Sequence, residues 1–156
     1  MPHALLRLAQ ILCLELFRPE EAQVKLNDLV KSDREFEVAK VLELQGDVNL
    51  KQDETKNLDL ALVHYKRSIQ IQPNNLVLLL KMGKCYDKKR NYNEAVQQYT
   101  KALLKDPQNT SIMFKLGWAY LRAGQKEKGL VQMRRSIGGG ETNIYNQIKL
   151  AEVLMR

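Results

Sequence analysis

The chain has 156 residues, of which 25 are Lys or Arg and 18 are Asp or Glu, so its formal net charge at pH 7 is +7. An apolar fraction of 44% beside a charged fraction of 28% is typical of a folded soluble protein, and the length suits one domain or a short repeat array. The two cysteines lie 72 residues apart, at Cys13 and Cys85, which excludes a disulfide framework, and with the two histidines they lack the spacing of a zinc site. No apolar run reaches the roughly 18 residues of a membrane helix.

The first predicted helices cover residues 5–17 and 20–31, with a break before Pro19, which fits the first turn of the second helix. The first of them is apolar enough to resemble a secretory signal. However, Arg7 and Glu15 interrupt it and no small-residue cleavage site follows, which excludes that interpretation. We therefore expect a reducing compartment, in practice the cytoplasm, with a nuclear or ciliary complex as the alternatives.

Helical spacing of apolar residues continues along the rest of the chain. Leu79, Met82 and Tyr86 fall on one face of a helix, and Tyr99 and Ala102 on one face of the next. The polar stretch 88–91 between them predicts a turn, so these two helices form an antiparallel pair.

The same features recur after 34 residues. Pro73 recurs as Pro107, and Tyr65 recurs as Tyr99, each within a similar local sequence. Gly83 and Tyr86 recur at the same interval as Gly117 and Tyr120. A period of this length is typical of helical repeat arrays.

Small residues inside each pair predict close packing of the two helices. Gly83 on the first helix and Ala95 and Ala102 on the second lack bulk, so the helix axes can approach to the short end of the usual 8–10 Å. Tyr86 and Tyr99 then fill the space around this contact. Proline after each second helix prevents its continuation.

With these residues in the signature places, the pattern resembles the tetratricopeptide repeat. The resemblance implies an all-α fold, a right-handed α-solenoid of stacked antiparallel helix pairs with about seven helices. The expected units are a degenerate repeat at 3–38, a repeat with a lengthened internal turn at 39–75, the best-matching repeat at 76–109, a further repeat at 110–143, and a half repeat or closing helix at 144–156.

Two units depart from the family pattern. Unit 39–75 is three residues too long, and we place the excess in its internal turn at 51–57. Unit 110–143 has Gly129 where Ala is usual, Met133 in the aromatic place, and glycines at 138–140 where Pro is expected.

Both ends of the array are unusually apolar for a solenoid, whose units bury their apolar faces only against neighbours. Further repeats or partner subunits that cover both ends would explain this. The alternative is an amino-terminal helix folded back on the array, with a closing helix that tolerates exposure.

The resemblance implies that the first helix of each pair lines a concave groove, where a peptide or helix of a protein partner, acidic or hydrophobic, would bind. Trp118, the only tryptophan, lies just after Gly117 of the signature and would face this groove as an anchor. The alternative is that Trp118 packs on the neighbouring first helix as core. The expected groove residues are Val77, Leu80, Lys84, Phe114, Trp118, Arg122, Tyr145 and Ile148.

Chaperone-tail binding, known in one subclass of the family, is not expected because Lys81 and Lys115 lack its partner residues four positions later. Catalysis is not expected either, since His64 and Cys85 are isolated and the glycines at 138–140 lack the Lys-Ser/Thr of a phosphate loop. We expect no cofactor and no metal, and we expect a noncatalytic scaffold that serves as one subunit of a complex.

Charge supplies the rival hypothesis. Residues 76–156 hold 15 Lys or Arg and 6 Asp or Glu, so this half would attract anionic partners such as RNA or another nucleic acid. The simpler interpretation is a soluble surface rich in lysine, and the basic clusters have no interleaved aromatic residues. The expected basic surface comprises Lys88, Lys89, Arg90, Arg134 and Arg135.

Overall fold

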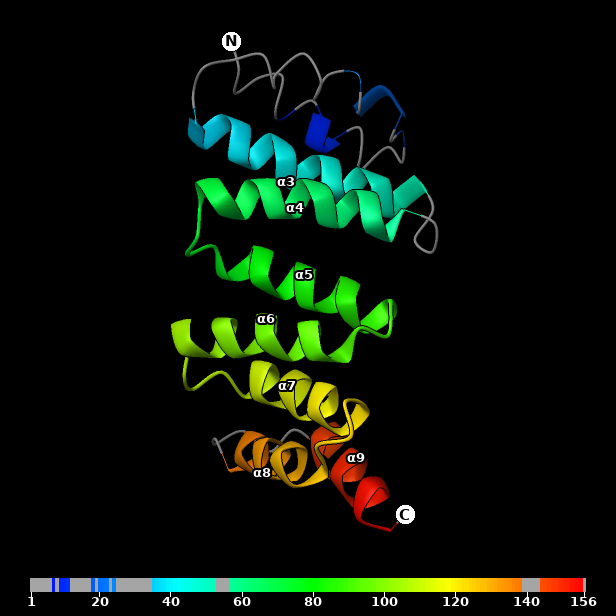
Figure 1. Cartoon of the computed structure of the whole chain (residues 1–156), viewed down its shortest axis with the longest axis vertical. Helices are drawn as coiled ribbons and strands as arrows, with labels where there is room; N and C mark the ends of the chain where they lie inside the picture. Colours follow the sequence, from blue (N-terminus) through cyan, green and yellow to red (C-terminus); the bar gives the residue numbers. More distant parts are fainter. Residues whose placement is uncertain are drawn as a thin grey trace. The chain divides into compact units, whose positions relative to one another are not determined.

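The computed structural model describes residues 35–52, 57–138 and 144–155, with residues 7, 9–11, 18, 20–22 and 24 ahead of them; within these ranges the side chains of 35–37, 52 and 144–146 are not described. Every regular element in the described part is an α-helix, which confirms the predicted fold class. The bounded helices are α3 (Glu35–Gln52), α4 (Leu58–Ile71), α5 (Leu76–Lys88), α6 (Tyr92–Lys105), α7 (Thr110–Arg122), α8 (Lys126–Ile137) and α9 (Ile144–Leu154) (Figure 1).

The chain divides into two compact units, Met1–Leu78 and Leu79–Arg156, with the boundary inside α5. In the first unit, α3 and α4 lie side by side (Figure 1). In the second, α6 packs on α7, α7 on α8, and α8 on α9.

The pairing of α3 with α4 depends on one small residue opposite one large one. The ring of Tyr65 lies so close to Gly46 that a β-carbon there would clash with it, and Tyr65 is fully buried. Its hydroxyl donates a hydrogen bond to Asp47 Oδ1 at 2.6 Å, and Ser68 Oγ donates to the Ala39 carbonyl oxygen at 2.7 Å. The hydroxyls of Tyr65 and Ser68 are thereby satisfied on α3.

The same arrangement recurs between α5 and α6. Tyr99 is 2% exposed and packs on Gly83, as the sequence predicts, while Leu79, Met82 and Tyr86 are buried around it. In the next pair Met133 takes the place of the tyrosine and packs on Gly117, and Gly129 faces Leu121 and the Gly117 backbone. In this pair Met133 replaces the tyrosine and Gly129 replaces the alanine of the family pattern. Both changes reduce side-chain bulk where α7 and α8 cross.

An asparagine begins the helix after each of two inter-pair turns. Asn75 Oδ1 accepts a hydrogen bond from the Leu78 amide, and Asn109 Oδ1 accepts one from the Ile112 amide, both at 3.1 Å. Each side-chain amide nitrogen donates backward, to Gln72 Oε1 at 3.4 Å and to Asp106 Oδ2 at 2.8 Å. These N-caps satisfy amides that the helix itself leaves unpaired.

The turns inside two successive pairs share one backbone conformation. Arg90 has φ +61° and Gly124 has φ +79°, both left-handed. In each turn the next amide bonds back to a tyrosine carbonyl, Asn91 to Tyr86 and Gln125 to Tyr120, at 2.9 Å. A side chain at Arg90 is strained in this region, whereas glycine is not.

Several predictions fall partly or wholly outside the described residues. These include most of unit 3–38, residues 53–56 of the predicted long turn, Gly139 and Gly140, and the Tyr145 side chain. Where the chain is described, residues 51 and 52 continue α3, which has 18 residues against 13 for α5. The first two residues of the predicted long turn 51–57 are therefore helical.

In the described part, no helix combines the length and the hydropathy needed to cross a membrane. The described residues also contain no group of three His, Cys, Asp or Glu side chains arranged to hold a metal ion.

Candidate functional site

One face of α7 carries a row of large side chains that the surrounding helices leave partly uncovered. Phe114, Trp118 and Arg122 follow one another at intervals of four residues, which places them on a single helix face. The rings of Phe114 and Trp118 have centroids 6.3 Å apart and planes at 88°, an edge-to-face contact. Both rings are half-buried, and Arg122 is exposed.

Arg122 is held between two aromatic rings. Its guanidinium carbon lies 5.7 Å from the centroid of Trp118 on the same helix and 5.9 Å from that of Tyr92, the first residue of α6. Both distances are within the range of cation–π attraction. The guanidinium is thus positioned by side chains from two helices.

A carboxylate from a third helix completes this cluster. Arg122 Nη1 lies 3.9 Å from Asp87 Oδ1 at the end of α5, with the side chains 50% and 18% exposed. At this distance the pair attracts electrostatically without a hydrogen bond. We call Asp87, Tyr92, Trp118 and Arg122 the arginine cluster.

Asp87 has one strong hydrogen bond and one unsatisfied oxygen. The Tyr99 hydroxyl donates to Oδ2 at 3.0 Å, while Oδ1 is buried and accepts no hydrogen bond from the described residues. Burial raises the pKa of Asp87, and the Tyr99 hydrogen bond and the Arg122 charge oppose this rise. Burial, and then the charge of Asp87, likewise raise the pKa of Tyr99.

The other predicted groove residues lie on α5 and α9. Val77 and Lys84 are exposed on α5 and Leu80 is half-buried between them. Ile148 is exposed on α9, and the side chain of Tyr145 lies outside the described residues. Phe114, Trp118 and Arg122 are joined by an edge-to-face and a cation–π contact.

The predicted basic surface consists of two separate groups. Lys88, Lys89 and Arg90 lie at the end of α5 and in the turn after it, whereas Arg134 and Arg135 are exposed in the last turn of α8. Basic residues near a helix carboxyl terminus interact favourably with the helix dipole. This interaction explains the positions of both groups without a bound ligand.

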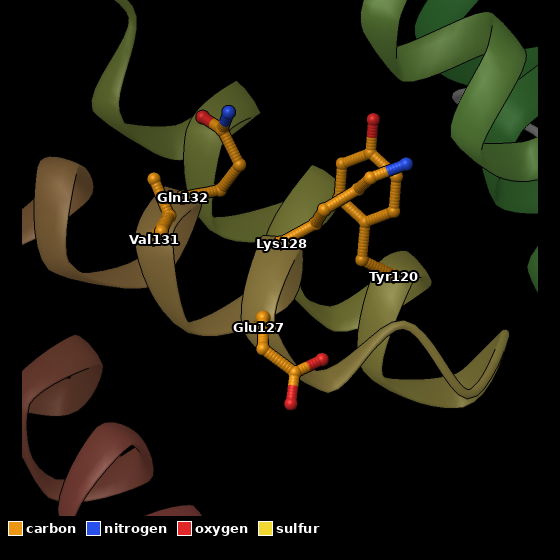
Figure 2. A pocket seen from close by; sticks show the side chains of 5 residues that line it. All are labelled: Tyr120, Glu127, Lys128, Val131 and Gln132. Carbon is orange, nitrogen blue, oxygen red and sulfur yellow. The ribbon is translucent and has the colours of Figure 1, made fainter.

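A hollow lies on α7 and α8, and its lining differs from the residues predicted for the groove. Its volume is about 270 Å³, and it is lined by Tyr120, Glu127, Lys128, Val131 and Gln132 (Figure 2). The Lys128 ammonium lies 5.8 Å from the centroid of the Tyr120 ring. This volume is below the usual 300–1,000 Å³ of small-molecule sites. Tyr120 is half-buried beside this hollow, whereas Tyr86 at the matching position of the preceding pair is buried.

The residues weighed as catalytic candidates are Cys85 and His64, which lie on α5 and α4. Cys85 is buried on α5, as expected of a small core residue. His64 is half-buried on α4, and its buried Nδ1 makes no hydrogen bond to the described residues. Burial, and next the nearby Arg67 charge, lower the pKa of His64.

Sequence reasoning missed the part played by Tyr92. An aromatic residue directly after the polar turn 88–91 was the available signal, but it indicates only the start of a helix. The contact with Arg122, which lies on the next first helix, depends on how the pairs stack.

Family models of the tetratricopeptide repeat match residues 77–109 and 98–130. No curated protein sequence matches the chain. Among solved structures, MamA residues 41 to the end from Desulfovibrio magneticus RS-1 is similar over 99% of this chain and 84% of its own, with a TM-score of 0.84 and 19% identity. A thermophilic TPR protein of Thermus thermophilus is similar over 100% and 82% respectively, with a TM-score of 0.71 and 20% identity. At such identities the likeness shows the fold.

Proposed function

Because residues 77–130 are tetratricopeptide repeats and the chain has the fold of such arrays, we propose that this protein is a noncatalytic scaffold that binds a segment of another protein in its concave groove. The row of Phe114, Trp118 and Arg122 on α7 carries the proposal. Its rings are half-buried rather than enclosed, so a partner can still cover them. Tryptophan and arginine are also the residues that most often dominate binding energies.

The proposal is tested by quantitative affinity capture followed by mass spectrometry, with Trp118→Ala beside the unaltered protein. The substitution should weaken partner binding by about 2 kcal/mol or more if Trp118 is an anchor. Leu104→Ala is the matched control, because Leu104 is 74% exposed on α6 and does not belong to the row. An unchanged dissociation constant for Trp118→Ala would contradict the assignment of Trp118 as an anchor.

Membership of a larger assembly is part of the same proposal. Ile148, Leu154 and Met155 are exposed on and just after α9, and Met155 is 81% exposed. Coverage of this apolar face by a further subunit or further repeats would lower the free energy of the exposed surface. Light scattering across a concentration series, with Ile148→Lys as the disrupting variant, tests this part; a monomer that binds no hydrophobic dye argues against it.

Nucleic-acid binding is the competing proposal, supported by the exposed Arg134 and Arg135 and the charge of the carboxyl-terminal half. The salt dependence of binding distinguishes the two proposals. For binding to phosphates, the logarithm of the binding constant falls steeply and linearly with the logarithm of the salt concentration. Binding in an apolar groove keeps most of its affinity as salt rises. A cytoplasmic location is part of the proposal, in keeping with two cysteines that cannot form a disulfide framework.

A further inference from the structure

The guanidinium of Arg122 contacts two rings and a carboxylate but makes no hydrogen bond within the described residues. Two rings and one carboxylate surround it, at 5.7, 5.9 and 3.9 Å. It donates no hydrogen bond to any residue in the described part of the chain, and its side chain is 50% exposed. A guanidinium carries five N–H donors in a planar fork, so a ligand that reaches the exposed part of Arg122 can accept hydrogen bonds from it.

Preorganisation gives this arginine an advantage as a receptor. A solvated arginine loses considerable side-chain freedom when it binds a ligand, whereas one already held by Trp118 and Tyr92 loses less. A planar fork with free donors matches a carboxylate, which accepts two parallel hydrogen bonds from it.

The surroundings of the fork define the rest of the ligand. Toward the start of α7 lie the half-buried rings of Trp118 and Phe114, which would contact an apolar side chain. On α5, the exposed Lys84 lies three residues before Asp87 and adds a second positive charge. The chemistry is therefore anionic at one end of the row and apolar at the other.

We propose that Arg122 is the receptor for a carboxylate of the bound segment, and that the partner is an acidic peptide with an apolar residue next to that carboxylate. This inference rests on the proposed function and specifies its ligand. Arg122 lies outside the residue pattern of the chaperone-tail subclass, so the arrangement is a feature of this chain.

Peptide carboxylates suit this site better than nucleic-acid phosphates. A nucleic acid gains its affinity from many phosphate contacts at once, whereas the arginine cluster contains a single cation. A single bidentate pair beside an apolar surface matches a peptide side chain and its neighbour.

Trp118 provides a direct probe, because it is the only tryptophan and belongs to the site. We suggest titrating the full chain with a blocked peptide of repeated Leu-Glu-Ser units while following tryptophan fluorescence. The isosteric Leu-Gln-Ser peptide serves as the neutral comparison, and oligouridylate as the nucleic-acid probe. The acidic peptide should bind at least about tenfold more tightly than the neutral one, the difference expected from one charged hydrogen-bonded pair.

Two substitutions assign that difference to the fork. Arg122→Gln should remove it, and Arg122→Lys, which keeps the charge but loses the planar fork, should retain only a part. Arg134→Gln is the matched control, since Arg134 is an exposed arginine on α8 outside the cluster. Circular dichroism melts establish that each variant is folded.

The outcomes separate this inference from the function on which it rests. Equal binding of both peptides, unaffected by Arg122→Gln, overturns the carboxylate receptor while leaving the groove in place. Salt-sensitive binding of oligouridylate without peptide binding overturns it in favour of a nucleic acid. Absence of any binding also overturns it, and the proposed function then falls only if Trp118→Ala leaves partner capture unchanged.

Discussion

Tyr99 lies so close to the backbone of Gly83 that a β-carbon on this glycine would be 2.5 Å from Cε1 of the ring. The ring is buried and its hydroxyl is bonded to Asp87, so it has little freedom to move away. One glycine therefore sets the separation of α5 and α6.

Gly83→Ala should lower the free energy of unfolding by about 1–3 kcal/mol, because the added methyl group overpacks this crossing. Urea unfolding followed by circular dichroism measures the change. Gly138→Ala is the control, since a β-carbon there would meet only backbone oxygens at 3.9 Å. Equal stability of the Gly83 variant and the unaltered protein would contradict the packing described for this pair.

Tyr99→Phe should destabilise the fold by about 1–3 kcal/mol, the usual effect of leaving a buried partner unsatisfied. The substitution keeps the ring but removes the hydrogen bond to Asp87 Oδ2, and the other oxygen, Oδ1, already accepts none from the described residues. Tyr120→Phe provides the comparison, because the Tyr120 hydroxyl makes no hydrogen bond within the described part of the chain. Similar losses in both variants would show that the hydroxyl of Tyr99 has no special role.

Asn109→Ala should reduce stability by about 1 kcal/mol, since Asn109 caps α7 through the Ile112 amide. Asn91, the N-cap of α6, makes no side-chain cap hydrogen bond, so Asn91→Ala should change stability much less. Thermal melts of the two variants in one buffer give the comparison. The prediction fails if the two substitutions have the same effect.

Acidification from pH 7.5 to 5.5 should destabilise the protein through His64. The folded state holds the pKa of His64 below its ordinary value of 6.5, so the unfolded chain binds the proton more readily. Stability is therefore present above pH 6.5 and falls as the pH falls through that value. Denaturant unfolding at both pH values, with His64→Gln as the comparison, isolates this group. A pH dependence that survives the substitution would assign it elsewhere.

The repeat period predicted the principal contacts of the second unit. Gly83 with Tyr99, and the burial of Leu79 and Met82, followed from helical spacing and the 34-residue interval. These contacts are local to one helix pair, where the spacing along two helices joined by a short turn already fixes which residues meet. The N-caps at Asn75 and Asn109 share the same interval, although the sequence interpretation did not use them.

The sequence by itself determined the all-α fold, the pairing of helices and the residue types on one face of α7, because each depends on spacing within a repeat. Only the tertiary structure decided that Asp87, Tyr92 and Trp118 meet around Arg122. These residues come from α5, α6 and α7, and their distances depend on how successive pairs stack. Stacking is determined by side-chain volume and burial at the contacts between pairs, which periodicity along the chain does not specify.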